Sequence, residues 1–150
     1  MQKLTLLVLA IVLSACSLPG SKSEFDTNLE KWQASNIKHY RYSLAVMCFC
    51  PGTDKMPLSI EVRDGEIVSM NYADGTPVTA QDVQSEFFSG FATIDRLFSE
   101  LKADLGGAAD EVAVKYHPTY GFPTEISIDR IKAAVDDELS LTVTEFEVLD

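Results

Sequence analysis

Two stretches of the chain repeat their hydrophobic residues at the spacing of an α-helix. In the first, residues 24–35, the apolar face carries Phe25, Leu29 and Trp32. Ser23 stands at its N-cap, with Asp26 at the capping-box position. The second begins after Thr93 as N-cap and ends at Gly106-Gly107, and its apolar face carries Ile94, Leu97, Phe98, Leu101 and Leu105. The pattern therefore predicts two amphipathic helices, the first of which buries Trp32.

Elsewhere hydrophobic and polar residues alternate, which is the spacing of a half-buried β-strand. The alternating sets are Tyr40, Tyr42, Leu44 and Val46; Leu58, Ile60 and Val62; Val68, Met70 and Tyr72; Val112, Val114 and Tyr116; Ile126 and Ile128; and Leu139, Leu141 and Val143. Asp64-Gly65 predicts a tight hairpin turn between the second and third sets. Past Val143 the alternation changes phase, which predicts a β-bulge near Thr144.

The order of these elements predicts an α+β domain over residues 24–150, an antiparallel sheet of about six strands with both helices on one face. Each half reads helix, strand, proline-containing loop, strand and strand, which indicates a tandem α-β-β-β duplication. A connection over residues 71–90, with a short helical turn near Asp82 to Phe88, separates the halves. The other face of the sheet is left uncovered and is a candidate surface.

Residues 1–15 have the layout of a signal peptide, with Lys3 in a polar start and an apolar stretch from Leu4 to Leu13. That stretch falls short of the roughly 20 residues that a membrane-spanning helix needs. Its end, Leu13-Ser14-Ala15-Cys16, resembles the lipobox of bacterial lipoproteins, where the leader is cut before the cysteine and the cysteine is acylated. The alternative is an ordinary secretory leader followed by an incidental cysteine.

The lipobox resemblance implies an exported protein that is anchored to a bacterial membrane through fatty acids such as palmitate on Cys16. Each buried methylene contributes about 0.8 kcal/mol, so more than one acyl chain gives lasting anchorage. Residues 16–23 are then the acylated cysteine and a flexible tether, which spans only about 15 Å by random-coil scaling. In a Gram-negative cell, Ser17 favours the periplasmic side of the outer membrane.

The acidic composition excludes one class of partner. The chain has 12 lysines and arginines against 23 aspartates and glutamates, and removal of the leader takes Lys3 away as well. Nucleic-acid binding needs a basic footprint, and anionic lipid headgroups repel an acidic domain. We therefore expect no nucleic acid as a partner, and contact with the membrane only through the anchor.

Cys48-Phe49-Cys50-Pro51 is the most distinctive motif after the lipobox. Cys48 and Cys50 are candidates for a disulfide, which is the default for paired cysteines outside the cytoplasm. A metal or copper site and a redox role remain open as alternatives. Nothing in the sequence places His39 or His117, the two histidines, beside the thiols.

The stretch from Tyr116 to Pro123 joins two strands and contains Gly121 and two prolines. One interpretation is a rigid connection whose aromatic residues pack on the sheet edge. The other is that Tyr120 and Phe122 project as aromatic anchors for a protein partner in the cell envelope.

A third candidate is the acidic group Asp129, Asp136, Asp137 and Glu138. It suits calcium by charge but lacks the spacing of a calcium loop, which favours a solvated turn. The usual motifs of a serine nucleophile, a zinc hydrolase and a phosphate-binding loop do not occur in the sequence. We therefore expect neither an enzyme nor a cofactor.

Taken in order, the lipobox, the Cys48–Pro51 motif, Asp64-Gly65, Tyr120–Pro123 and the acidic group resemble the bacterial lipoproteins of the DUF6174 family, a domain of unknown function. The resemblance spans nearly the whole mature chain and implies a location and a fold, with no activity attached. Where that family is expected to have aspartate in a Tyr-Asp-Pro run, this chain has His117.

The sequence thus favours a membrane-anchored, non-catalytic binding or accessory module of the cell envelope. The alternative is a redox or metal-handling lipoprotein that uses Cys48 and Cys50.

Overall fold

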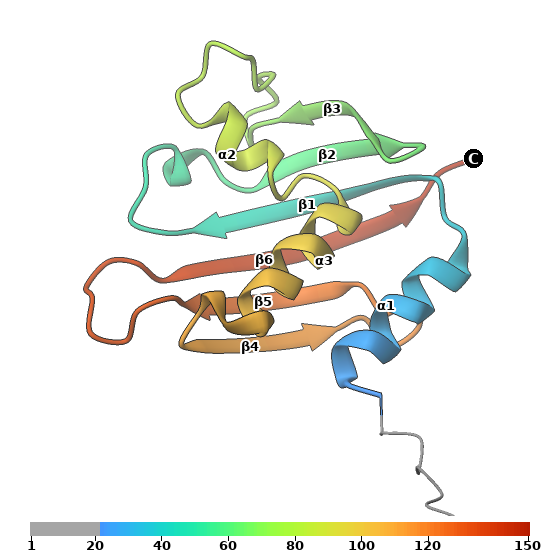
Figure 1. The fold of residues 1–150 in the computed structure, drawn as a ribbon. Helices are drawn as coiled ribbons and strands as arrows, with labels where there is room; N and C mark the ends of the chain where they lie inside the picture. The colour runs from blue at the N-terminus through green and yellow to red at the C-terminus, as the bar shows by residue number, and fades with distance from the viewer. Residues whose placement is uncertain (1–21) are drawn as a thin grey trace, which may run out of the picture.

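The computed structural model describes residues 22–150, so the predicted signal peptide, Cys16 and most of the predicted tether lie outside the described residues. Six strands form one antiparallel sheet in the order β3-β2-β1-β6-β5-β4 (Figure 1). They are β1 (His39–Met47), β2 (Leu58–Arg63), β3 (Glu66–Asn71), β4 (Glu111–Tyr116), β5 (Pro123–Asp129) and β6 (Leu139–Val148). The predicted α+β class and six-stranded sheet are confirmed. No helix in this part of the chain has the length and apolar character to cross a membrane.

The helices are α1 (Glu24–Ser35), α2 (Ser85–Ser89) and α3 (Ile94–Ala103), with a 3-10 turn η1 (Thr53–Lys55) and a π-helical turn η2 (Asp104–Ala108). Figure 1 shows α1 and α3 on the same face of the sheet, as predicted. Both predicted N-caps are present: Ser23 Oγ accepts the N–H of Asp26 at 3.0 Å, and Thr93 Oγ1 accepts that of Arg96 at 3.1 Å.

The core lies between the helices and the four inner strands of the sheet, β2, β1, β6 and β5. Tyr40 and Tyr42 of β1 are 2% and 1% exposed. The hydroxyl of Tyr40 contacts the first residue of α3, and that of Tyr42 contacts the chain just before α3. Tyr40 Oη accepts the N–H of Ile94 at 3.1 Å, and Tyr42 Oη donates to the carbonyl of Phe91 at 3.3 Å. Burial disfavours the phenolate, so the pKa of Tyr40 is raised to about 12 and that of Tyr42 also rises well above its ordinary value.

Two hydrophobic residues expected in the core are exposed. Leu105 is 48% exposed because the last turn after α3 is a π turn, whose extra residue rotates the side chain off the core face. Val68 is 54% exposed because a register shift between β2 and β3 turns Ile67 inward in its place. The bulge predicted near Thr144 is confirmed: the register of β1 and β6 shifts there, and Glu145 has φ 53°.

The predicted repeat is present in the order of the elements but is not a symmetry of the sheet. β1 begins its three-stranded meander at the centre of the sheet, whereas β4 begins its own at the edge. The meanders β1-β2-β3 and β4-β5-β6 both progress across the sheet in the same lateral direction, but their first strands, β1 and β4, run in opposite directions. Because α1 and α3 lie on the same face, no rotation superposes one meander on the other.

Candidate functional site

An aromatic cluster fills one end of the sheet, where α1 begins and β5 starts; we call this the tether end. Phe122 lies at its centre, 1% exposed, with ring centroids 4.7 Å from His117 and 4.4 Å from Phe146. Trp32 of α1 meets Phe122 edge to face at 6.0 Å. The prediction that Phe122 is a partner contact is therefore wrong, because α1 covers it. Tyr120 is only half-buried, and its role as a contact stays a prediction.

Gly121 is the reason that this motif packs so closely under α1. Its φ of 79° matches the predicted turn, and a Cβ there would lie 2.8 Å from Lys31 Cβ and closer still to the backbone oxygen of Asn28. His117 holds the other side of the turn: its carbonyl accepts the N–H of Gly121 at 2.8 Å, and its Nδ1 accepts that of Tyr120 at 3.2 Å. Helix and turn thus interlock at the tether end.

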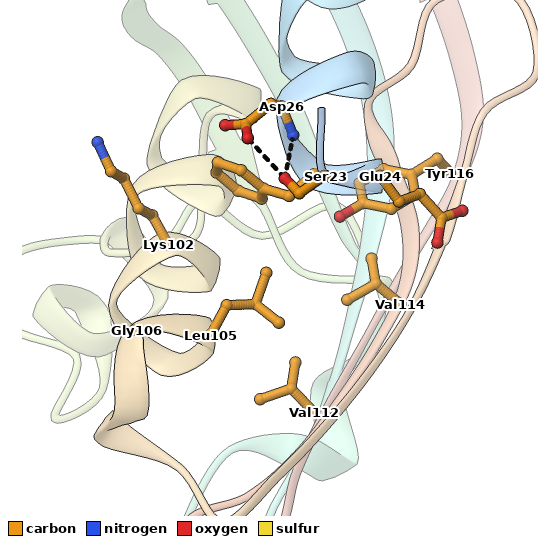
Figure 2. A pocket seen from close by; sticks show the side chains of 10 residues that line it. Ser23, Glu24, Asp26, Lys102, Leu105, Gly106, Val112, Val114 and Tyr116 are labelled. Carbon is orange, nitrogen blue, oxygen red and sulfur yellow. Dashed lines mark hydrogen bonds between the residues drawn. The ribbon is translucent and has the colours of Figure 1, made fainter. Parts of the chain in front are cut away.

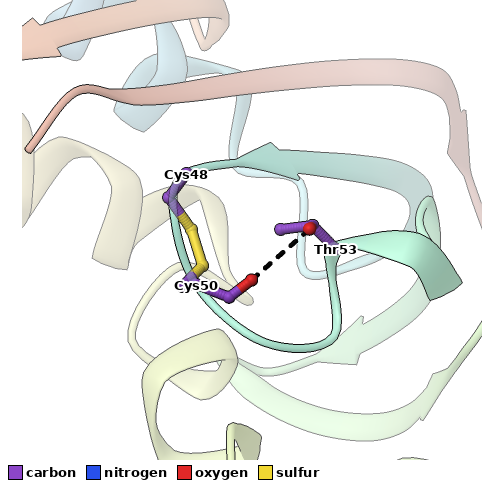
Figure 3. The surroundings of a disulfide bond; sticks show 3 residues. All are labelled: Cys48, Cys50 and Thr53. Atoms are coloured by element: carbon purple, nitrogen blue, oxygen red, sulfur yellow. Dashed lines mark hydrogen bonds between the residues drawn. A yellow bond between two sulfur atoms is a disulfide. The ribbon is translucent and has the colours of Figure 1, made fainter. Parts of the chain in front are cut away.

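The opposite end of the sheet carries a small covalent ring. The sulfurs of Cys48 and Cys50 are bonded, with Cα atoms 5.2 Å apart (Figure 3). Phe49, between them, is 83% exposed, and Met47 before them is 69% exposed. Gly52 follows with φ 87°, and a Cβ there would touch the buried ring of Phe88 at 3.4 Å. The loop therefore packs against the core at Gly52, while the side chain of Phe49 is exposed to solvent.

The β5–β6 loop lies beside this ring because β1 pairs with β6, Met47 opposite Ser140. Met47 and Phe49 line one depression of about 500 Å³ together with Asp136 and Glu138. Val135, in the same loop, is 83% exposed. We call Met47, Phe49, Val135, Asp136 and Glu138 the distal patch. It joins exposed apolar side chains to acidic ones, and it is not evident from the sequence.

The acidic group is only partly a solvated turn. Asp137 Oδ2 accepts the N–H of Ile131 at 2.8 Å and closes the loop, but its Oδ1 and that of Asp129 are buried without a hydrogen-bond partner. Burial, and then the neighbouring carboxylates with Asp137 first among them, raise the pKa of Asp129. Within residues 22–150, no three His, Cys, Asp or Glu side chains are grouped to hold a metal ion.

His39 and His117 both lie at the tether end, away from the cysteines. His39 Nε2 contacts Glu61 Oε1 at 2.8 Å, and this hydrogen bond lowers the pKa of Glu61. His39 Nδ1 lies 2.9 Å from the carbonyl oxygen of Asp150. The structure therefore brings neither histidine to the thiols as a further ligand.

A cleft of about 590 Å³ opens between the start of α1, the π turn η2 and β4 (Figure 2). Its apolar lining includes Phe25, the exposed Leu105, Val112 and Val114. Tyr116 lines the end near Glu24; burial, then that carboxylate, raises its pKa to about 12. The cleft is not evident from the sequence, because the helical periodicity predicts that Leu105 lies in the core.

Comparison with known proteins adds a family. The model of a family of unknown function (DUF6174) matches residues 24–148, from the first residue of α1 to the last of β6. No curated protein and no solved structure matches the chain. The match therefore covers the α+β domain and brings no activity with it.

Proposed function

Since the chain belongs to this family of unknown function (DUF6174), we propose its role from its own residues: a lipid-anchored, non-catalytic binding module of a bacterial envelope. In this role the distal patch holds a protein partner, and acylated Cys16 keeps the domain at a membrane.

The anchor is supported by the chain before α1. The leader ends in Leu13-Ser14-Ala15, which together with Cys16 resembles a lipobox, and α1 begins at Glu24, a few residues beyond Cys16. The bonded pair Cys48–Cys50 agrees with export, because disulfides persist outside the cytoplasm.

The distal patch is the observation that carries the binding role. Methionine and aromatic side chains are enriched at protein interfaces, and Met47 and Phe49 are held in solvent on a loop that the disulfide and Gly52 fix in place. A fixed loop loses little conformational entropy when it binds. The carboxylates of Asp136 and Glu138 beside it select a partner whose apolar pocket has a basic rim.

The position of the patch suits this role. β1 has nine residues and runs from the tether end to Cys48, so the patch lies about 30 Å from the end at which α1 begins. A domain tethered through Cys16 can therefore present the patch away from the membrane. Among the described residues no serine, threonine or cysteine side chain is hydrogen-bonded to a histidine, which supports a role without a nucleophile activated in that way.

Two variants test the two parts of the proposal separately. Cys16→Ser is expected to abolish palmitate labelling and release the chain from the membrane fraction, while Cys48→Ser keeps both label and location. Phe49→Ser is expected to remain on the membrane but lose its partner in quantitative co-purification, with Val148→Ser, an exposed residue at the tether end, as the matched control. Equal partner recovery from both variants would contradict the binding role.

The bonded cysteines favour a second candidate, thiol–disulfide exchange with another envelope protein. The two candidates differ in which variant fails. A binding module loses its partner in Phe49→Ser with the disulfide intact. An exchange protein keeps activity in Phe49→Ser and loses it in Cys50→Ser, and it traps a mixed disulfide with its substrate through the remaining thiol.

A further inference from the structure

The outer side of β4 is unoccupied by any described segment. β4 pairs with β5 at one end of the sheet order, and no backbone hydrogen bond joins its other side to residues 22–150. The opposite edge differs: Val78 donates its N–H to the carbonyl of Met70 at 2.9 Å, and Pro77 bridges to Asn71, so a loop protects β3. An open edge presents unpaired N–H and C=O groups to another strand.

The sequence of β4, Glu-Val-Ala-Val-Lys-Tyr, is complementary to itself when reversed. If a second copy runs antiparallel with Ala113 on a two-fold axis, Glu111 stands opposite the partner's Lys115, and Lys115 opposite the partner's Glu111. Val112 then faces the partner's Val114, and Val114 faces the partner's Val112, on the helical side of the sheet. Opposite charges and branched apolar residues directly opposite one another both stabilise an antiparallel pair.

We propose that two copies of this chain associate through β4 in this register and join their sheets into one. The charges beside β4 extend the match. Within one chain, Lys115 already contacts Glu125 at 2.7 Å and Glu111 contacts Lys132 at 3.1 Å. Pairing the edges joins these contacts into one chain of alternating charge, Glu125, Lys115, the partner's Glu111 and the partner's Lys132, although the partner's Asp129 also lies opposite the partner's Glu111 in the sheet.

The apolar cleft gives a second reason for this partner. It opens beside β4 and is lined by Leu105, Val112 and Val114, which stay partly exposed in one copy (Figure 2). A second strand along β4 brings the partner's Val112 and the partner's Val114 against the open flank of the cleft. Burial of this apolar surface drives the association, and the charges set its register.

Crosslinking across the axis tests the pairing directly. Directly opposite residues of an antiparallel pair have Cα atoms about 4.5–5.5 Å apart, within the range of a disulfide. In the full chain, in bacterial membranes with an added oxidant, Ala113→Cys is expected to give a disulfide-linked species of twice the chain mass. Ser127→Cys, exposed on the same face of β5, is the matched control and is expected to stay monomeric, because β4 separates it from the axis.

Charge variants show whether β4 sets the register. In the Ala113→Cys chain, Lys115→Glu turns both facing ion pairs into repulsions and is expected to lower the crosslinked fraction at least about tenfold. Adding Glu111→Lys restores complementarity and is expected to restore the crosslink. Glu147→Lys, which breaks the exposed ion pair with Arg41 in mid-sheet, leaves the fraction unchanged. Thermal unfolding confirms that each variant is folded.

The outcomes that overturn the proposal are equally concrete. They are equal crosslinking from Ala113→Cys and Ser127→Cys, no crosslink from either, an adduct with a protein of another mass, or no recovery in the charge-swapped double variant.

Discussion

The two ends of the sheet use aromatic residues in opposite ways. At the tether end, Phe122 and its neighbours are packed under α1, with 1% of Phe122 exposed. At the distal end, Phe49 is 83% exposed on a loop closed by a disulfide. An aromatic residue in a Gly- and Pro-containing turn is thus no guide to exposure by itself. What decides is whether a helix covers the turn, and α1 covers only the tether end.

The sharpest test of this contrast is to remove one phenyl ring at each end. Phe122→Ala is expected to lower the free energy of unfolding by about 3–5 kcal/mol, because it leaves a cavity among packed aromatic rings. Phe49→Ala is expected to change it by less than about 0.5 kcal/mol, because its ring lies in solvent. Urea unfolding of both variants measures the difference, and similar losses at the two positions would contradict the contrast.

The interlock between Gly121 and α1 predicts a smaller loss. Gly121→Ala is expected to cost roughly 3 kcal/mol, because the new methyl group meets α1 and an L residue is strained at φ 79°. Gly75→Ala, with φ 85° and nothing within 4 Å of the place its methyl group would take, carries only the strain of about 1–2 kcal/mol. Thermal and urea unfolding of the pair separate contact from strain; equal costs would mean that α1 yields to the methyl group.

The smallest effect is expected at the distal end, from Asp129. Because its pKa is raised, the carboxyl group of Asp129 holds its proton more tightly in the folded chain than in the unfolded chain. The free energy of unfolding therefore falls as pH rises through that pKa. Asp129→Asn removes the buried charge and is expected to raise Tm at pH 7, with the gain vanishing below about pH 3.9, where the carboxyl is neutral in both states. Asp54→Asn, in η1, is the control. An unchanged or lowered Tm at pH 7 would contradict the predicted cost of this charge, which comes from burial first and from the neighbouring carboxylates second.

The sequence predicted the features that local signals determine. Ser23 and Thr93 cap their helices, Asp64 and Gly65 turn the hairpin with φ 52° and 81°, and the phase change near Thr144 marks a bulge. Each depends on a few adjacent residues whose conformational preferences agree with the fold.

The remaining features depend on contacts between distant segments. Phe122 is buried by α1, which ends almost 90 residues earlier, and the distal patch exists because β1 and β6 pair across nearly the whole domain. Periodicity predicts that Leu105 and Val68 lie in the core, because it does not reveal one extra residue in a π turn or a register shift between strands. The candidate surfaces therefore required the structure, whereas most of the sheet did not.

One measurement tests the central claim, that the domain meets its protein partner with the distal end. A photo-crosslinking amino acid is placed at Phe49 or at Tyr120 in the full chain in living cells, with Glu138→Lys as a second change in each. We expect a discrete adduct from position 49 that Glu138→Lys weakens, and none from position 120. An adduct from position 120 with none from position 49 would contradict it.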